Sequence, residues 1–366
     1  MQRVLFLLVV LIVFSFPLKQ DKILAKETST SEIGQPIRGI YVKAENTKGP
    51  KFQKLLSLVN QTELNAMVID LKDDHGNLTF LPSKTSPYYA VSRPYIQDPS
   101  TLMHILKTNH IYPIARIVVF KDSVLANKQP HLSFKTTMGI WKNTRGDSFT
   151  NPFLKEVWDY NIGMAEEAAS LGFKEIQFDY VRFPEKFETF EHQLTYDKGE
   201  FHAMRGQTRI AAVSAFVKYA SEQLKPYQVK VSVDVFGNAT VIPEAPGIGQ
   251  NFSNIAENVD VISAMIYPSH WTSIFGIRKP DLEPYRLVKE YARVESVRLN
   301  QLTHPPVSRP WLQDFTAAWL GKGNYKVYGK KEIEDQIRGL HAQGIHEFLL
   351  WNASNHYTSN VDYTPF

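Results

Sequence analysis

Short β-branched runs alternate with helical patterns along almost the whole chain, and this alternation constrains the fold more than any other feature of the sequence. A strand followed by a helix returns to the sheet in the same direction, so the pattern predicts parallel strands joined by right-handed crossovers. Eight such units close naturally into a barrel. The expected strands cover 39–45, 66–73, 112–120, 175–184, 230–237, 259–268, 309–315 and 347–354.

Apolar residues at helical spacing predict the helices between these strands. Only twelve residues follow the last strand, so the last helix is expected to be short or missing. We therefore predict an α/β protein with one (β/α)8 TIM-barrel domain over residues 37–366. An open doubly wound sheet is the alternative, but no Gly-rich phosphate loop follows the first strand. The expected helices are 50–62, 99–109, 152–171, 207–225, 281–299 and 330–343, with a weak one at 254–258.

The first residues have the pattern of an export signal. An apolar stretch from Val4 to Phe16 follows a basic start and precedes a polar segment. Such a run of roughly 7–15 residues is typical of a signal peptide and is shorter than the ~20 residues of a spanning helix. We expect residues 1–25 to be cleaved after Ala25 and 26–36 to form a solvated tether. An uncleaved anchor is the alternative, since no clean Ala-x-Ala site occurs. Either way, we expect a secreted or cell-surface domain.

Composition excludes several kinds of chemistry. Cysteine is absent, which rules out disulfides, thiolate catalysis and Cys-ligated metals. The formal net charge of +4 comes without a dense basic stripe, so no nucleic-acid partner is expected. Neither His-x-His nor His-Glu-x-x-His spacing occurs, so we expect no metal and no cofactor. Membrane contact is expected only through an uncleaved amino-terminal segment.

Polar side chains recur at inward-facing positions near the carboxyl ends of the expected strands. Barrel enzymes build their sites at this face, whereas an inert barrel interior is filled with Val, Ile and Leu. A single residue is explained equally well by a structural pair, such as Asp70 with Lys72. Charges on several strands together instead predict a polar pocket, because unpaired buried charges are costly. On the first three strands the candidates for substrate contact are Tyr41, Lys43, Glu45, Asp70, Lys72, Asp73 and Arg116.

Two aspartates on neighbouring strands are the candidates for catalysis. Asp179 ends a hydrophobic run on the fourth strand, and Asp234 occupies the matching place on the fifth. Adjacent strands lie about 4.8 Å apart, so two inward carboxylates could flank a single bond, as glycoside hydrolysis requires. For each aspartate, a loop-capping or other structural role is the alternative.

Aromatic and polar residues surround these positions in the later strands and their loops. Aromatic faces pack against the apolar faces of sugar rings, while polar neighbours bind the hydroxyls. Any one aromatic residue is also explained as part of the core. The further candidates for substrate contact are Tyr180, Arg182, Tyr267, His270, Trp271, Trp351 and Asn352.

Five segments together resemble a bacterial family of barrel proteins described as glycoside hydrolases: 39–43, 68–73, 178–184, 265–271 and 350–354. The resemblance covers about residues 37–357 and implies a catalytic barrel that acts on carbohydrate. A more distant similarity to chitinase-like glycosidases breaks at Val181, where those enzymes carry their acid glutamate. An aspartate on strand four followed by an acid on strand five is similar to amylase-like barrels, although those have Glu where this chain has Asp234.

The sequence therefore predicts a hydrolase acting on an extracellular or cell-surface polysaccharide. Asp179 is expected to be the nucleophile or stabilising base and Asp234 the general acid. Two short aspartates at the same height favour the roughly 5–5.5 Å separation of retaining enzymes over the 6.5–9.5 Å of inverting ones. The alternative function is a non-catalytic barrel that binds glycan at the cell surface.

Overall fold

The computed structural model describes residues 34–242, 245 and 247–365. The expected signal peptide, residues 1–25, lies outside the described residues, as do residues 26–33 of the expected tether. Within the described residues, none of the helices has the length and apolar character needed to span a bilayer.

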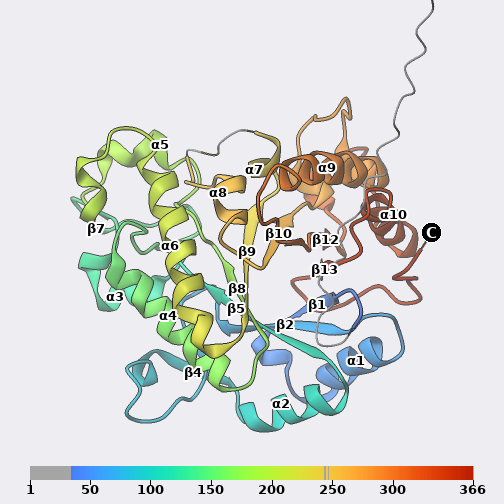
Figure 1. Ribbon diagram of the computed structural model, residues 1–366, viewed down its shortest axis with the longest axis horizontal. Helices are drawn as coiled ribbons and strands as arrows, with labels where there is room; N and C mark the ends of the chain where they lie inside the picture. Colours follow the sequence, from blue (N-terminus) through green and yellow to red (C-terminus); the bar gives the residue numbers. More distant parts are fainter. Residues whose placement is uncertain (1–33, 243–244, 246, 366) are drawn as a thin grey trace, which may run out of the picture.

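Eight parallel strands form a closed barrel (Figure 1). The pairing of β1 with both β2 and β13 closes the ring, so none of the eight barrel strands forms an open edge. This closure confirms the predicted TIM barrel and excludes the open doubly wound sheet. In order around the ring, the strands are β1 (Arg38–Val42), β2 (Ala66–Lys72), β5 (Tyr112–Val118), β8 (Glu175–Asp179), β9 (Lys230–Phe236), β10 (Val261–Met265), β12 (Trp311–Gln313) and β13 (Phe348–Trp351).

Helices form the outer layer, with α1 and α2 on one side of the barrel, α4 and α6 on another, and α9 and α10 together on a third (Figure 1). No helix follows β13 in the described residues, which agrees with the prediction for the last unit. The helices of this layer are α1 (Gly49–Asn60), α2 (Pro99–Thr108), α4 (Lys155–Ser170), α6 (Thr208–Leu224), α8 (Phe252–Ala256), α9 (Pro284–Leu299) and α10 (Lys330–His341).

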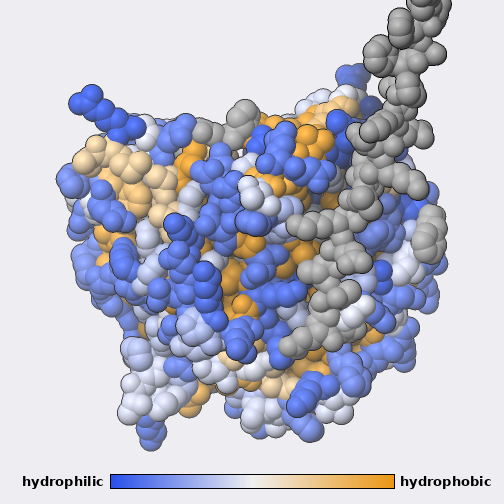
Figure 2. Space-filling model, in the orientation of Figure 1, coloured by the Kyte–Doolittle hydropathy of each residue, from blue (hydrophilic) through white to orange (hydrophobic). Residues whose placement is uncertain are grey.

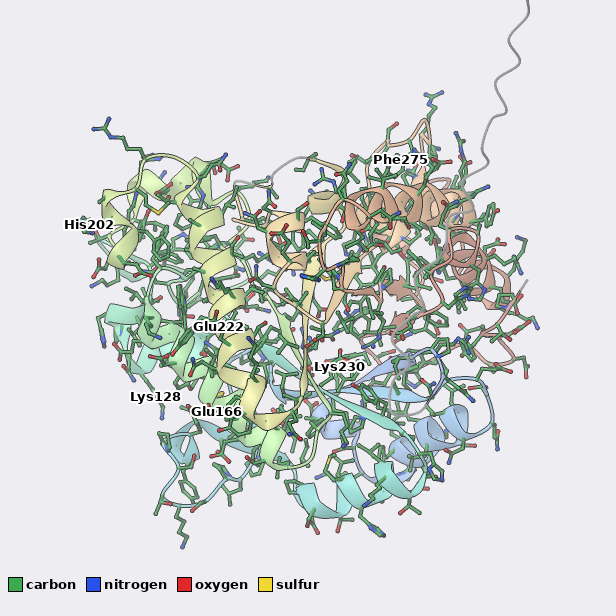
Figure 3. All side chains as sticks on the ribbon, in the orientation of Figure 1. Lys128, Glu166, His202, Glu222, Lys230 and Phe275 are labelled. Atoms are coloured by element: carbon green, nitrogen blue, oxygen red, sulfur yellow. The ribbon has the colours of Figure 1, made fainter. Side chains whose placement is uncertain are left out.

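Most of the remaining elements lie in the loops that follow the barrel strands. These are β3 (Leu78–Phe80), β4 (Ser92–Ile96), α3 (Ser123–Lys128), β6 (Lys135–Thr136), β7 (Gly139–Ile140), α5 (Phe187–Phe190) and α7 (Asn238–Val241), while β11 (Val307–Ser308) precedes β12. The 3-10 helices are η1 (Ala44–Asn46), η2 (Tyr89–Val91), η3 (Pro130–Leu132), η4 (Glu191–Gln193), η5 (Gly199–Ala203), η6 (Lys225–Tyr227), η7 (Pro268–His270), η8 (Pro280–Leu282) and η9 (Ala318–Leu320). Figure 3 shows Phe275 of the β10–α9 loop beyond the carboxyl end of β9, away from Lys230 at the start of that strand.

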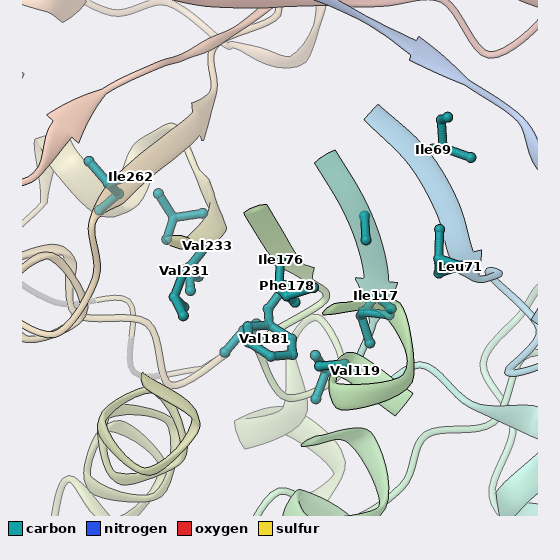
Figure 4. Packing of buried hydrophobic residues seen from close by; sticks show 14 of the residues in the cluster. Ile69, Leu71, Ile117, Val119, Ile176, Phe178, Val181, Val231, Val233 and Ile262 are labelled. Atoms are coloured by element: carbon teal, nitrogen blue, oxygen red, sulfur yellow. The ribbon is translucent and has the colours of Figure 1, made fainter. Parts of the chain in front are cut away.

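Alternation along the strands divides the core into two layers. Figure 4 shows Ile69, Ile117, Ile176, Val233 and Ile262, on five neighbouring strands, in the layer that packs between barrel and helices. The residues between them face the barrel axis, because successive strand side chains point to opposite faces. The inner cluster includes Val68, Ile114, Trp311 and Leu349. On the view of Figure 2 polar residues cover most of the surface, with apolar patches between them.

An ion-pair cluster fills the amino-terminal end of the barrel. The Nη1 atom of Arg309 lies 2.8 Å from Oε2 of Glu175, and its Nε lies 2.8 Å from Oε2 of Glu347. Tyr112 donates to Glu175 at 3.4 Å. These charges are buried and paired with one another, so they fill the amino-terminal end of the barrel interior. A ligand site is therefore expected at the opposite, carboxyl end.

Candidate active site

Four charged side chains meet at the carboxyl mouth of the barrel. Asp70 in β2 is opposite Arg116 in β5, while Asp179 ends β8 and Asp234 lies in β9. Phe178 is opposite Val233, so Asp179 comes level with Asp234 at the next position. The exposed fraction is 5% for Asp70 and Asp179, 2% for Asp234 and 1% for Arg116. Strand alternation thus turns these four side chains inward, away from bulk water.

Arg116 binds three carboxylates at once. Its Nε and Nη2 atoms donate to Oδ2 of Asp179 at 2.9 and 2.6 Å, and its Nη1 donates to Asp70 at 2.7 Å. Its Nη2 also reaches Asp74 at 3.0 Å. The backbone N–H of Tyr180 donates to the other oxygen of Asp179 at 2.6 Å. Both oxygens of Asp179 are therefore occupied by hydrogen-bond donors, two from the guanidinium and one from the backbone.

Asp234 has a different environment. Burial, followed by the negative charge of Asp179, raises the pKa of Asp234 well above its ordinary value. The indole Nε1 of Trp311 donates to Oδ1 of Asp234 at 2.8 Å and only partly offsets these effects. The two neighbouring carboxyl groups thus have different surroundings: a guanidinium contacts Asp179, whereas Asp234 is buried against an indole and its pKa is raised. Such a difference is the usual basis for assigning a base and an acid.

Asp70 has a less extreme pKa. Burial raises it to about 6, against the opposing charge of Arg116. The hydroxyl of Tyr41 donates to Oδ2 of Asp70 at 2.5 Å. Because Tyr41 and Arg116 occupy both of its oxygens, Asp70 orients the guanidinium that contacts Asp179.

Aromatic rings line one side of this cluster. Tyr41 and Trp351 stack with centroids 4.1 Å apart at 19°, and Trp311 meets Trp351 edge-on at 5.5 Å. The guanidinium carbon of Arg116 lies 5.7 Å from the Tyr41 ring and 5.5 Å from the Trp351 ring. A rigid apolar wall therefore adjoins the carboxylates.

Tyr180 and Arg182 follow Asp179 in the loop after β8. Tyr180 adopts a left-handed backbone conformation with φ of 51°, which is strained for an aromatic residue and turns its N–H toward Asp179. Arg182 packs over Tyr180 at 4.8 Å and over Phe236 at 4.6 Å. Tyr267 lies just after the carboxyl end of β10, and burial and the charges of Asp234 and Asp179 raise its pKa.

Lys72 does not face the mouth, contrary to the sequence-based expectation. The β2–β5 register shifts between Asp70 and Lys72, and this irregularity turns Lys72 toward the helices. Its ammonium lies 2.7 Å from Asp122 and donates to Asn161 of α4 at 2.7 Å. All three side chains are fully buried, so Lys72 is part of the packing between barrel and helices.

Two other predicted substrate contacts have structural partners instead. Oδ1 of Asp73 accepts from the backbone N–H groups of His75, Gly76 and Asn77, which closes the turn before β3. The amide nitrogen of Asn352 donates to carbonyls in the loops after β12 and β13.

The remaining candidates are not part of the carboxylate cluster, by which we mean Asp70, Asp179, Asp234 and the Arg116 that contacts two of them. Trp271 packs against Tyr291 of α9 with ring centroids 6.0 Å apart, and a side chain on Gly237 would collide with it. Glu45 is exposed in η1, Lys43 is half-buried beside it, and His270 is exposed in the β10–α9 loop.

Asp74 was not among the predicted site residues. It lies in the turn after β2, outside the strand alternation on which the prediction relied, and contacts Arg116 from there. The contact between Trp311 and Asp234 was not predicted either: the indole Nε1 of Trp311 donates to Oδ1 of Asp234. Across residues 34–242, 245 and 247–365, no group of three or more His, Asp or Glu side chains is arranged to hold a metal ion.

A family model described as "Putative glycosyl hydrolase domain" matches residues 39–357. No curated protein matches the sequence. Among solved structures, a hypothetical protein from Ruminiclostridium thermocellum ATCC 27405 is 30% identical, with 54% of this chain and 97% of that chain covered and a TM-score of 0.46.

Two further solved structures share the fold. The PgaB (BpsB) glycoside hydrolase domain from Bordetella bronchiseptica is 15% identical, with 88% and 96% covered and a TM-score of 0.60. A beta-galactosidase from the psychrophilic Marinomonas ef1 is 11% identical, with 86% and 54% covered and a TM-score of 0.55. At these identities the likeness establishes the barrel architecture.

Proposed function

Because the chain belongs to the family described as "Putative glycosyl hydrolase domain", we propose that it hydrolyses glycosidic bonds of an extracellular or cell-surface polysaccharide. The family assigns the chain to the glycoside hydrolases, and the carboxylate pair Asp179 and Asp234 is our assignment within it. The observation that carries this assignment is the contrast between the two groups. Arg116 contacts Asp179 through two nitrogens, whereas burial and the charge of Asp179 raise the pKa of Asp234 well above its ordinary value, and the indole of Trp311 contacts Asp234.

Asp234 acts as the general acid in this proposal. It donates its proton to the glycosidic oxygen as the bond between that oxygen and the anomeric carbon breaks. Asp179 supplies the negative charge on the other side. It either attacks the anomeric carbon, giving a glycosyl-enzyme that water later hydrolyses, or takes a proton from the attacking water.

Arg116 positions Asp179 through two hydrogen bonds to one of its oxygens. The same guanidinium is held by Asp70 and Asp74, so its orientation does not depend on Asp179 alone. Trp351, half-buried and backed by the stacked ring of Tyr41, offers an apolar surface for a sugar ring beside the carboxylates. Tyr267 packs in the same buried cluster as Tyr41 and Trp311 and orients the same sugar in this proposal.

The first experiment is a survey of bacterial wall glycans and common polysaccharides for new reducing ends. The wild-type protein should produce them, and Asp179→Asn should lose activity by about two orders of magnitude or more. Asp159→Asn, on the outer surface of α4, is the matched control and should remain active. Binding without cleavage of any substrate would instead favour the non-catalytic, glycan-binding barrel.

Export is part of the proposal and rests on residues 1–25. Amino-terminal sequencing of the protein from culture medium or the cell surface should begin near residue 26. A protein that starts at Met1 in the membrane fraction would indicate an amino-terminal anchor.

A further inference from the structure

A row of aromatic rings leads from the carboxylate cluster to the surface of the mouth. Tyr267 lies 5.3 Å from His270 and 5.9 Å from Phe315, measured between ring centroids. Phe315 stacks on Trp319 at 5.9 Å and 22°, and His270 meets Trp319 at 6.4 Å. The exposed fraction rises from 7% at Tyr267 to 65% at Trp319. We call Tyr267, His270, Phe315 and Trp319 the aromatic row.

The inner end of the aromatic row belongs to the candidate active site. Tyr267 packs in the same buried cluster as Tyr41 and Trp311, which hydrogen-bond Asp70 and Asp234. The outer end comes from a different part of the chain, the loop between β12 and α10. A single extended ligand could therefore contact both the carboxylates and Trp319.

A buried polar network holds the two loops of the aromatic row together. Gln313 is fully buried, and its Oε1 accepts from the backbone N–H of Ser269 at 3.1 Å and from the Ser269 hydroxyl at 2.7 Å. Its Nε2 donates to Asp281 at 3.1 Å and to the carbonyl of Phe315 at 3.0 Å. One side chain thus fixes the residue before His270 and the backbone of Phe315.

The outer part of the β12–α10 loop is tied down as well. The backbone N–H of Lys326 donates to Asp281 at 3.0 Å, and the ammonium of Lys279 donates to the carbonyl of Gly323 at 2.8 Å. Trp319 is consequently presented to water by a braced loop. Leaving a large apolar ring exposed is unfavourable, and an exposed ring on a preorganised support is typical of a binding surface.

We propose that the aromatic row binds sugar residues of the polysaccharide beyond the cleaved bond, with Trp319 stacking on one of them. This inference rests on the proposed function and deepens it. A flat indole next to the active site suits the apolar face of a pyranose ring. The row extends outward from the carboxylates, so the enzyme takes a chain of several sugars and not a mono- or disaccharide.

The test compares Trp319→Ala with Val327→Ala, a control at a 75% exposed residue of the same loop. On a soluble polysaccharide that the wild type cleaves, Trp319→Ala should raise KM by about tenfold or more, while kcat changes far less. Val327→Ala should keep the wild-type KM. Equal KM values for the two variants would overturn the role of the aromatic row and leave the proposed function intact.

Binding without turnover gives a second measurement. In native gels containing the same polysaccharide, Asp179→Asn should be retarded and the double variant Asp179→Asn/Trp319→Ala should not. Equal retardation of the two overturns the inference. A shift from dimer to monomer caused by Trp319→Ala, with KM unchanged, would assign the ring to a contact between copies and also overturn it. If the wild type cleaves no polysaccharide and Asp179→Asn binds none, the proposed function fails, and the inference fails with it.

Discussion

Replacing Asp234 by asparagine should remove activity without weakening the fold. The carboxyl group is buried, and burial together with the charge of Asp179 raises its pKa well above the ordinary value, which favours the neutral form. Asparagine has nearly the same shape and is always neutral. Its amide oxygen can accept the hydrogen bond from Trp311 that Asp234 now accepts at 2.8 Å. Loss of the general acid should lower kcat by about 10²–10⁴.

The sign of the stability effect follows from the raised pKa. Between the ordinary value of 3.8 and the raised pKa, the folded protein holds a proton at Asp234 that the unfolded chain releases. Wild-type stability therefore falls as the pH rises through this window, by up to about 1.36 kcal/mol per pH unit. Asparagine removes this contribution. At about 1–2 °C per kcal/mol, the Tm of Asp234→Asn relative to wild type should rise by about 2 °C per pH unit.

Thermal unfolding at about pH 5, 6 and 7, together with kcat at each pH, measures both effects. Glu295→Gln is the matched control. Burial raises the pKa of Glu295 to about 8, and its carboxylate accepts from Ser308 at 3.0 Å in the outer layer. This variant should show the same trend in Tm and keep full activity. If the Tm difference for Asp234→Asn is the same at all pH values, Asp234 is ionised in the folded protein and its role as general acid is refuted.

Three further predictions follow from the same contacts. Arg116→Lys should lower kcat and lower the free energy of unfolding, measured in urea, by at most roughly 3–5 kcal/mol, because one ammonium cannot replace a guanidinium bound to three carboxylates. Wild-type values of both quantities would contradict the role of Arg116 in positioning Asp179. Lys72→Met should lower the free energy of unfolding by a similar amount, because it leaves Asp122 buried without its cation, and KM should stay at the wild-type value. A raised KM at unchanged stability would show that Lys72 contacts substrate. NMR of the first product should show retention of the anomeric configuration, whereas the opposite anomer would make Asp179 a base acting through water.

The fold was predictable from the sequence because its signals are local. Strand and helix periods are read within single segments, and their strict alternation admits few topologies. The eight predicted strands agree with the eight strands of the ring except at their ends. The fourth, for example, was expected to reach residue 184, but β8 stops at Asp179. Tyr180 leaves the strand there in a left-handed conformation.

Parts of the candidate site followed from the same periodicity, and parts did not. Alternation along the strands turned Asp70, Arg116, Asp179 and Asp234 inward as expected, so these four could be grouped from the sequence. The same rule failed for Lys72, because an irregularity in the pairing of β2 and β5 reverses its direction. Loops have no regular alternation of side-chain direction, so the positions of Asp74 and of the exposed Trp319 ring could not be predicted from the sequence.

What only the tertiary structure decided is the different surroundings of the two catalytic candidates. Asp179 and Asp234 are chemically identical side chains at matching strand positions, so the sequence by itself determined their location but not their difference. That difference arises because Arg116 of β5 lies against Asp179, whereas Trp311 of β12 and the surrounding barrel remove Asp234 from water. Electrostatic effects depend on distance in space and on burial, and both exist only once the barrel has closed.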